Sequence, residues 1–328
     1  AQLVTFCTFV SMENIRSLRI VFLGTPDFAV ASLEALHTAG FHIAGVITAP
    51  DKPAGRGLQL QQSAVKQFAV EHQIPVLQPV KLKDPAFIAA LDEWNADLQV
   101  VVAFRMLPEI VWNRPRLGTI NLHGSLLPQY RGAAPINWAI INGESVTGVT
   151  TFLLQHTIDT GNILGQKEVS IGENEDAGSL YNRMKIIGAN LLVNTVQQYV
   201  AGTLTPTPQE VYIATTQEEL HNAPKINKET GAIDWNKSAT QINNLIRGLS
   251  PSPGAHTKLE GKMLKIYKAV RLPAPSAGIP GTTETDGKTF LYFNCGNERL
   301  SILELQLDGK KRMNVEEFLR GYRFNAGA

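Results

Sequence analysis

The chain has 328 residues, of which 44% are hydrophobic and 18% charged, and its formal net charge at pH 7 is +1. These proportions are typical of a soluble globular protein with a sizeable core, and the length predicts two domains. No apolar run approaches the roughly 18 to 20 residues that a membrane-spanning helix requires. The sequence therefore excludes an integral membrane protein with helical spans.

The two cysteines, Cys7 and Cys295, stand near opposite ends of the chain. They form no C-x-x-C pair for metal or redox work, and this pattern favours a reducing cytoplasm. Residues 1–17 lack the basic region and the small-residue cleavage site of a secretory signal. We interpret them as a disordered N-terminal extension, within which Met12 is a candidate for the native start.

Charge is distributed unevenly along the chain. Residues 224–328 contain 16 Lys and Arg against 10 Asp and Glu, a net charge of +6, whereas the remainder carries −5. This asymmetry favours contact between the carboxyl-terminal part and a polyanion, although charge alone is equally compatible with an ordinary solvated basic surface.

Short apolar runs alternate with amphipathic segments over the first hundred residues. Buried strands are predicted at residues 18–24, 43–48 and 98–104, and helices at residues 27–39, 63–71 and 85–94. Strands of near-continuous hydrophobicity are typical of a parallel sheet that is covered on both faces. The pattern predicts a doubly wound α/β fold with a mostly parallel, Rossmann-like sheet.

The turn after the first strand tests for a nucleotide cofactor. A dinucleotide site needs the glycines of a G-x-G-x-x-G pattern, for a tight turn and for close approach to the pyrophosphate. Here Gly24 is followed by Pro26, where the second glycine would stand. A nicotinamide- or flavin-dependent dehydrogenase is therefore disfavoured.

Residues 49–57 read APDKPAGRG. Two prolines and two glycines in nine residues predict a loop rather than a helix or strand, and Lys52 and Arg56 place two cations on it. A basic loop is ordinarily solvated, but beside an active site it can contact a phosphate backbone or stack on an unpaired base.

A further strand is predicted at residues 118–122, and it leads into the sequence NLHGSLLP. Side chains two apart on a strand point to one face, so Asn121 and His123 face the same volume. An amide and an imidazole placed in this way can donate to a carbonyl oxygen that gains negative charge, or move a proton. Asp159, in the loop after the next strand, is the candidate that orients the imidazole. In isolation, such residues are more often loop caps or partly buried polar groups.

Residues 178–200 have the apolar spacing of a helix, and we expect this helix to close a first domain that spans residues 18–204. The Pro- and Thr-rich sequence that follows is typical of a linker, which we assign to residues 205–223.

Residues 224–328 are predicted to form a second domain. Ser238 is a candidate cap for a helix at residues 239–248, and short strand-like runs follow it. This combination predicts a small OB-like β-barrel, a fold that often binds nucleic acid. The cations that we would test for such contact are Arg247, Lys262, Lys265, Lys268, Lys310, Lys311 and Arg312.

The sequence NLHGSLLPQYRGAAP at residues 121–135, with TGVT at 147–150 and IDTG at 158–161, resembles the 10-formyltetrahydrofolate-dependent formyltransferases. The sequence GTPDF at residues 24–28 is similar to the opening of the methionyl-tRNA formyltransferase branch of that family. The resemblance covers about residues 18–323, and it implies the two-domain fold described above.

The resemblance also implies roles for individual residues. Asn121, His123 and Asp159 match the catalytic group, and PAGRG at residues 53–57 resembles a loop that enters the acceptor end of initiator tRNA, with Arg56 as its main contact and Lys52 beside it. The folate site implied by the resemblance consists of Phe104, Arg105, Met106, Leu107, Ser125, Leu126, Leu127 and Pro128, with the turn before Pro108 binding the pterin through its backbone.

The chain departs from the family pattern at Arg105, where glycine is frequent, in the lysine-poor segment after Gly57, and in the Pro-Ser-Pro sequence at residues 251–253. These departures concern the folate turn and the RNA contacts, and they leave the catalytic group intact. No His, Cys or Asp cluster has the spacing of metal ligands, and a formyl donor that is already activated needs no metal.

We therefore predict an enzyme that transfers the formyl group of 10-formyltetrahydrofolate to the α-amine of methionine on initiator tRNA, for translation initiation. We expect it to be a cytoplasmic monomer that contacts no membrane. The alternative is a formyltransferase that acts on a small amine, such as an amino sugar nucleotide or glycinamide ribonucleotide. It would share the trio but need neither Arg56 nor a basic second domain. A non-catalytic nucleic-acid-binding module would leave the trio and the following SLLP unexplained.

Overall fold

The computed structural model describes residues 17–54, 59–276 and 278–324. Of the predicted N-terminal extension, only Ser17 falls within this range. Contacts between residues group the chain into two compact units whose segments interleave along the sequence. The first comprises the chain up to Arg131, Gly148–Val169 and Asn182–His221, and the second comprises Gly132–Thr147, Ser170–Tyr181 and the chain from Asn222. The predicted domain boundaries, with a linker at residues 205–223, stay a prediction.

A seven-stranded sheet forms the centre of the first unit. Its strands are β1 (Arg19–Gly24), β2 (His42–Ile47), β5 (Val76–Leu77), β6 (Leu98–Val102), β7 (Thr119–His123), β9 (Val146–Leu153) and β10 (Ile163–Ser170). They lie in the order β10-β9-β7-β6-β1-β2-β5. Neighbours from β5 to β7 are parallel, whereas β9 runs antiparallel to β7. The predicted mostly parallel sheet is confirmed.

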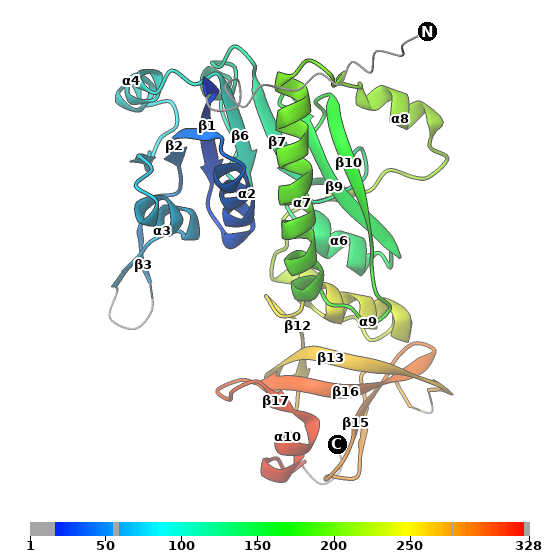
Figure 1. Ribbon diagram of the computed structural model, residues 1–328. Coiled ribbons are helices and arrows are strands. Elements are labelled where there is room, and N and C mark those ends of the chain that lie inside the picture. The colour runs from blue at the N-terminus through cyan, green and yellow to red at the C-terminus, as the bar shows by residue number, and fades with distance from the viewer. Residues whose placement is uncertain (1–16, 55–58, 277, 325–328) are drawn as a thin grey trace. The chain divides into compact units, whose positions relative to one another are not determined.

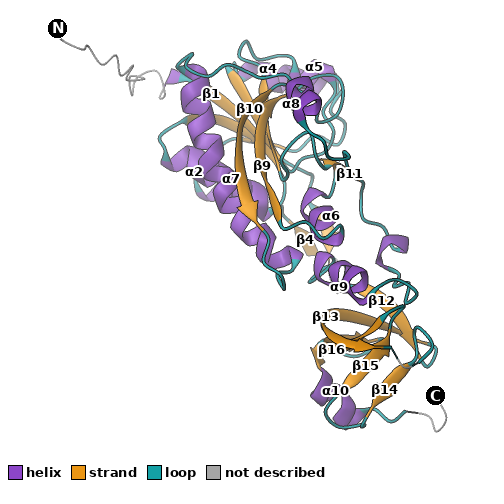
Figure 2. Ribbon diagram, turned by 90° about the vertical axis from the view of Figure 1, so that its right-hand side faces the viewer, coloured by secondary structure: helices purple, strands orange, loops and turns teal. Residues whose placement is uncertain are grey.

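Helices cover both faces of this sheet (Figures 1 and 2). They are α2 (Asp27–Thr38), α3 (Ala64–Glu71), α4 (Pro85–Glu93), α5 (Glu109–Trp112) and α7 (Ala177–Val200), and a short helix, α8 (Gln209–Thr215), follows them. On one face, Val21 and Leu23 of β1 belong to a buried cluster with Phe87 of α4. On the other face, α7 approaches β7 so closely that a Cβ on Gly188 would lie 2.9 Å from Leu122. The sheet is therefore doubly wound, as predicted.

A hairpin stands where the sequence predicts a loop. Strands β3 (Lys52–Ala54) and β4 (Gln59–Gln61) pair in antiparallel register, with Pro53 opposite Leu60. The prediction that this stretch holds no strand is therefore wrong. A two-stranded ribbon has two free edges, and proline is tolerated on an edge because its missing N–H is not needed there. Arg56, between the two strands, lies outside the described residues.

The second unit contains an antiparallel sheet and three helices. The strands are β12 (Ala255–Leu259), β13 (Lys262–Pro275), β14 (Thr283–Thr285), β15 (Leu291–Asn294), β16 (Glu298–Leu307) and β17 (Met313–Asn314), and the helices are α6 (Pro135–Ile141), α9 (Ala239–Gly248) and α10 (Val315–Gly321). The described residues also contain the short pair β8 (Arg131–Gly132) and β11 (Asn222–Ala223), and the 3-10 turn η1 (Glu229–Gly231).

Pairing in this sheet runs in one series, β12-β13-β16-β15-β14, with β17 added beside β16. Ser238 caps α9 as predicted, because its hydroxyl accepts from the backbone N–H of Gln241 while the Gln241 side chain accepts from the backbone N–H of Ser238. The predicted domain of short antiparallel strands is confirmed, and the helix α10 was not foreseen.

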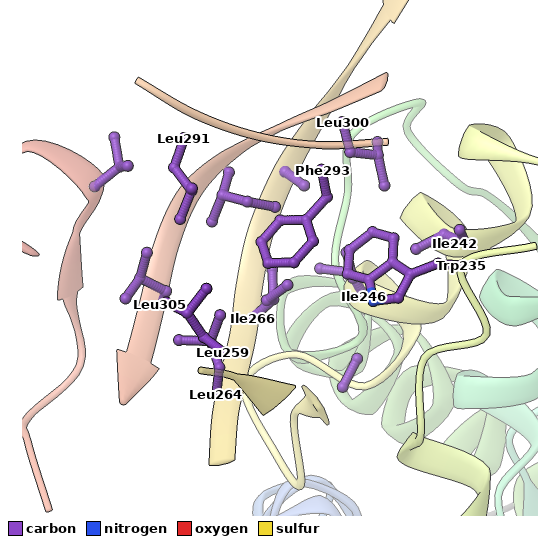
Figure 3. Packing of buried hydrophobic residues seen from close by; sticks show 14 of the residues in the cluster. Trp235, Ile242, Ile246, Leu259, Leu264, Ile266, Leu291, Phe293, Leu300 and Leu305 are labelled. Atoms are coloured by element: carbon purple, nitrogen blue, oxygen red, sulfur yellow. The ribbon is translucent and has the colours of Figure 1, made fainter. Parts of the chain in front are cut away.

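The core of the second unit is apolar. Trp235 and Phe293 stack with ring centroids 4.4 Å apart and planes 5° from parallel, and Figure 3 shows the aliphatic side chains around them. Ile242 and Ile246 of α9 belong to the same cluster. Further members come from β12, β13, β15, β16 and α10, and on the strands alternation turns apolar side chains toward the core.

Candidate active site

Asn121 and His123 lie on β7, at the carboxyl ends of the parallel strands. Leu122, between them, faces α7, so Asn121 and His123 face the opposite side of the sheet. Asn121 pairs in register with Val101 of β6, which belongs to the cluster under α4 and α5. Asn121 is partly exposed and His123 is buried. The amide is thus accessible to a ligand, while the imidazole is shielded.

The His123 ring is anchored through one nitrogen. Nε2 lies 2.9 Å from the carbonyl oxygen of Tyr130, and because a carbonyl only accepts hydrogen bonds, Nε2 carries the hydrogen. In the neutral ring, Nδ1 is then the unprotonated nitrogen, so it is the atom available for proton transfer.

Asp159 approaches that free nitrogen from the loop after β9. Its Oδ2 lies 3.9 Å from Nδ1 of His123, and both side chains are buried. The separation is too long for a direct hydrogen bond, and it places the carboxylate directly beside the nitrogen that is available for proton transfer. The structure therefore brings together two residues that are 36 positions apart in the sequence, as the resemblance implied.

The loop that carries Asp159 is tightly folded. Asp159 has a φ of +54°, in the left-handed region that non-glycine residues rarely adopt. A Cβ on Gly161 would lie 1.6 Å from the carbonyl oxygen of Leu153, at the end of β9. Only glycine fits at position 161, and this close contact sets how the loop leaves the strand.

The loop after His123 is held from within by hydroxyl groups. Ser125 donates to the carbonyl of Gln129 at 2.6 Å. Thr150 of β9 donates to the carbonyl of Ser125 at 2.7 Å and accepts from the N–H of Leu127 at 3.1 Å. The Leu127 side chain is buried with Phe152 and Ile163. Among the predicted folate residues, Ser125 and Leu127 thus shape the loop, while Leu126 is partly exposed and Pro128 is buried.

The second predicted folate segment follows β6. Ala103 has a φ of +48°, Met106 is exposed, and Phe104 and Leu107 pack against the cluster under α4 and α5. Arg105 donates to the carbonyl of Val80 at 2.9 Å and to that of Pro79, and its guanidinium lies over the Phe104 ring. The side chain that departs from the family pattern therefore ties this turn to the neighbouring loop.

A cavity of about 380 Å³ opens between the loop after His123, β10 and α8. Leu126, Pro128, Gln166, Tyr212 and Leu220 are among its lining residues. Asn121, His123 and Asp159 do not line it. We therefore do not identify this cavity with the reaction centre.

The predicted RNA contacts differ in what they bind within the protein. Lys52 is exposed on β3. Arg247 donates to Asn244 at 3.0 Å and to the carbonyl of Glu175 at 3.2 Å, and burial lowers the pKa of its guanidinium. Its side chain is therefore committed to the second unit's own structure, although sequence reasoning placed it among the RNA contacts.

The remaining predicted cations lie on or after β13. Lys262, Lys268 and Lys310 are exposed, whereas Lys265 donates to the carbonyl of Pro253 at 2.9 Å. Lys311 is 3.1 Å from Glu317, and Arg312 pairs with Glu304 and lies over the Tyr267 ring.

Two further features concern His156 and the possibility of a metal site. His156 is exposed, with Nε2 3.4 Å from Glu109, so it takes no part in the His123–Asp159 pair. Among the described residues, no group of three or more His, Cys, Asp or Glu side chains is arranged to hold a metal ion. The same described residues also include no helix with the length and apolar character needed to cross a membrane.

Sequence reasoning missed Gln209, which is fully buried at the start of α8. Its side-chain amide donates to the carbonyls of Asp159 and Gly161. The segment around Gln209 is polar and has the composition of a linker. No pattern within it indicates that this one glutamine is buried. The only usable signal is its position directly after Pro208, where a helix can begin.

An amide and an imidazole, those of Asn121 and His123, thus stand at the carboxyl ends of the parallel strands of an α/β sheet, with the Asp159 carboxylate beside the imidazole. Residues 18–196 match the family described as Formyl transferase, and residues 225–323 match the Formyl transferase, C-terminal domain. The chain belongs to the formyltransferase family, which confirms the sequence-based assignment.

Individual proteins agree with this assignment. The chain is 51% identical over 310 residues to the methionyl-tRNA formyltransferase of Bacteroides fragilis, an alignment that covers 93% of this chain and 95% of the relative. The fold is similar to that of an N-formyltransferase from Helicobacter canadensis, which was solved with folinic acid and dTDP-3-aminofucose. The TM-score is 0.64 at 20% identity, and the alignment covers 87% of this chain and 98% of that one.

The fold is also similar to HypX from Aquifex aeolicus, solved in complex with tetrahydrofolic acid, with a TM-score of 0.61 and 18% identity. The alignment covers 94% of this chain, which spans about half of that longer protein. At this level of identity, both solved structures support the fold alone.

Proposed function

We propose that the protein transfers the formyl group of 10-formyltetrahydrofolate to the α-amine of methionine esterified to initiator tRNA, giving formylmethionyl-tRNA for translation initiation. The observation that carries the proposal is the buried His123–Asp159 pair beside a partly exposed amide, Asn121. The name of relatives that are about half identical over nearly the whole chain supports the choice of acceptor.

The reaction forms a bond from the acceptor amine to the formyl carbon, breaks the bond from the folate nitrogen, and moves one proton from the amine to that nitrogen. Negative charge grows on the formyl oxygen meanwhile. The Asn121 amide is the donor that would stabilise it from the start, and His123 could donate beside it only once Nδ1 has taken up the amine proton. Because Nε2 of His123 is bound to Tyr130, Nδ1 would hold the proton in transit, and the Asp159 carboxylate would stabilise the resulting imidazolium.

The residues around the site suit a folate co-substrate, which supplies the formyl group. A pterin has amide-like donors and acceptors that backbone groups can match. The turn after β6 and the loop after His123 both leave strand ends beside Asn121, where ligands of α/β sheets bind. We assign the backbone of residues 104–107 and the loop at residues 125–128 to this role, with the Arg105, Ser125 and Leu127 side chains holding the two segments in shape.

For the RNA, we assign contacts to Lys52 and Arg56 of the hairpin and to the exposed lysines of the second unit. The net charge of +6 over residues 224–328 supports this choice, since phosphate contacts dominate the affinity for nucleic acid. We place the enzyme in the cytoplasm, where its substrates are made, and expect it to act as a monomer.

The experiment that tests the proposal incubates the purified full chain with 10-formyltetrahydrofolate and methionyl-initiator tRNA, with methionyl-elongator tRNA as the matched control. We expect formylmethionine from the initiator tRNA alone. Product from neither tRNA, with folded protein and bound folate, would overturn the choice of acceptor. A small-amine acceptor, such as an amino sugar nucleotide, would then be tested with the same catalytic trio.

A further inference from the structure

The segment at residues 205–223, which we call the connector, contains one residue unlike its neighbours. Gln209 is completely buried, whereas Glu210 and Val211 beside it are exposed. Burying an amide is unfavourable unless all of its polar atoms find partners. The partners of Gln209 therefore indicate why it is there.

The amide of Gln209 is bound on both sides. Its Nε2 donates to the carbonyl oxygen of Asp159 at 2.8 Å and to that of Gly161 at 2.9 Å. Its Oε1 accepts from Nε and Nη2 of Arg131, at 3.1 and 2.6 Å. A guanidinium only donates and a carbonyl only accepts, so the orientation of the amide is fixed. A glutamate here would place a negatively charged oxygen against the two carbonyls.

The loop that Gln209 holds is the one with the unfavourable backbone. Asp159 has a φ of +54°, a conformation that is unfavourable for a non-glycine residue and persists only where the surroundings enforce it. The hydrogen bonds from Gln209 hold the carbonyl of Asp159 itself and the carbonyl of Gly161, two positions later. They fix the direction in which the Asp159 carboxylate leaves the backbone.

The same connector also holds the other half of the catalytic pair. The N–H of Tyr130 donates to the carbonyl of His221 at 2.7 Å, and the Gln129 side chain donates to the carbonyl of Glu219 and accepts from the N–H of His221, both at 2.9 Å. The carbonyl of Tyr130 in turn accepts from His123. One end of the connector thus reaches the Asp159 loop, and the other reaches the anchor of His123.

We propose that Gln209 is a positioning residue of the formyl transfer reaction: its neutral amide, oriented by Arg131, sets the Asp159 carboxylate against Nδ1 of His123. This inference rests on the proposed role of the His–Asp pair and goes beyond it by adding a residue that touches neither substrate. The 3.9 Å between the two side chains is then maintained from a segment 50 residues further along the chain.

A double-mutant cycle between Gln209 and Asp159 tests the inference. Gln209→Met keeps the approximate volume and removes the donors, and we expect it to lower kcat about 10- to 100-fold while the KM for the formyl donor changes less than about threefold. In an Asp159→Asn background, the same change should lower kcat less than about threefold, because the group it positions is gone. Equal losses in both backgrounds would overturn the proposal.

A second variant guards against loss of folding. Gln209→Glu keeps the pairing with Arg131 but repels the two carbonyls, so we expect a loss of kcat close to that of Gln209→Met. Its pH–rate limb should also move, because the Asp159 carboxylate would no longer be held against Nδ1 of His123. A variant with reduced kcat and an unmoved limb would argue for a merely structural role.

Gln217→Glu is the matched control, since it makes the same change at an exposed position of the connector. It should leave kcat and the pH–rate limb unchanged. The cycle needs only an acceptor that the wild-type chain formylates, so it can be measured with a small amine if tRNA fails. Failure of the proposed acceptor and failure of the positioning role are thus distinguishable.

Discussion

The surroundings of β7 in the first unit and the core of the second unit bury different kinds of side chain. Around β7, the first unit buries a histidine, an aspartate, a glutamine and two hydroxyl residues, His123, Asp159, Gln209, Ser125 and Thr150. The second unit buries an almost wholly apolar cluster built on Trp235 and Phe293, and keeps its charged side chains largely at the surface.

This difference separates two physical tasks. Hydrogen bonds have narrow preferences of distance and angle, so a buried polar network can hold catalytic groups in one geometry. Apolar contacts are not directional, and their contribution grows with the area removed from water. The buried polar network around β7 thus holds the catalytic groups in position, although burying polar groups costs stability. The apolar cluster stabilises the second unit, whose charged side chains lie largely at the surface.

The sharpest test of the apolar cluster in the second unit is the variant Phe293→Ala. Phe293 is fully buried and stacked on Trp235, so its truncation should lower the free energy of unfolding of the second unit by about 3 to 5 kcal/mol. Urea unfolding followed by tryptophan fluorescence would measure this loss. A change below about 1 kcal/mol would contradict the interpretation of this cluster as the stabilising core.

Cys295 offers a second readout of the same variant. Burial raises the pKa of its thiol to about 11, so the folded unit should react slowly with alkylating reagents. Labelling of the peptide that contains Cys295 should accelerate in Phe293→Ala. Tyr292→Ala, which alters the partly exposed neighbour on the other face of β15, is the control and should change labelling far less.

The polar half is tested by Asn121→Ala. Loss of one donor to a developing oxyanion typically costs about 3 to 4 kcal/mol of transition-state stabilisation, so we expect kcat to fall at least about 100-fold while the urea midpoint hardly moves. Asn113→Ala, at an exposed position of the same unit, is the matched control. A loss below about tenfold with folding intact would refute the role of Asn121.

Local patterns predicted the elements that carry the site. Alternation on β7 was enough to place Asn121 and His123 on one face, and the glycine-containing sequence IDTG after β9 indicated Asp159, because both signals lie within a few residues. The cap at Ser238 was predicted for the same reason, since a capping box is a contact between residues three apart.

Contacts between distant segments could not be predicted in this way. Gln209 is 50 residues from Asp159 and 78 from Arg131, and its segment has the composition of a linker. Arg247 reads as a surface cation, but it is directed inward by carbonyls more than 70 residues away. The hairpin at residues 52–61 was missed because proline disfavours a central strand but not a strand edge.

We expect the exposed lysines of the second unit to contribute less than Phe293 contributes to stability or Asn121 to catalysis. Changing Lys262, Lys268 and Lys310 together to alanine should raise the KM for tRNA about tenfold at low salt and leave kcat nearly unchanged. The slope of log(kcat/KM) against log salt should fall in magnitude by up to about 2, since each phosphate contact releases counterions. Lys81→Ala with Lys83→Ala, two exposed cations of the first unit, is the comparison; an equal effect would show that the charge asymmetry does not direct RNA binding.

The smallest expected effect concerns His256, on β12 of the second unit. Burial lowers the pKa of its imidazole from the ordinary 6.5, and Lys228 and Lys265 lower it further. In the pH range between the pKa of His256 in the unfolded chain and its lower pKa in the folded chain, the unfolded chain binds more protons. The free energy of unfolding therefore falls as the pH drops through this range, and the full stability is present above it.

His256→Gln removes this titration and should flatten the dependence of the melting temperature on pH between about 7 and 5. We expect a difference of no more than about 2 °C, because the ring is partly exposed. Equal acid sensitivity in wild type and His256→Gln would assign the effect to other groups.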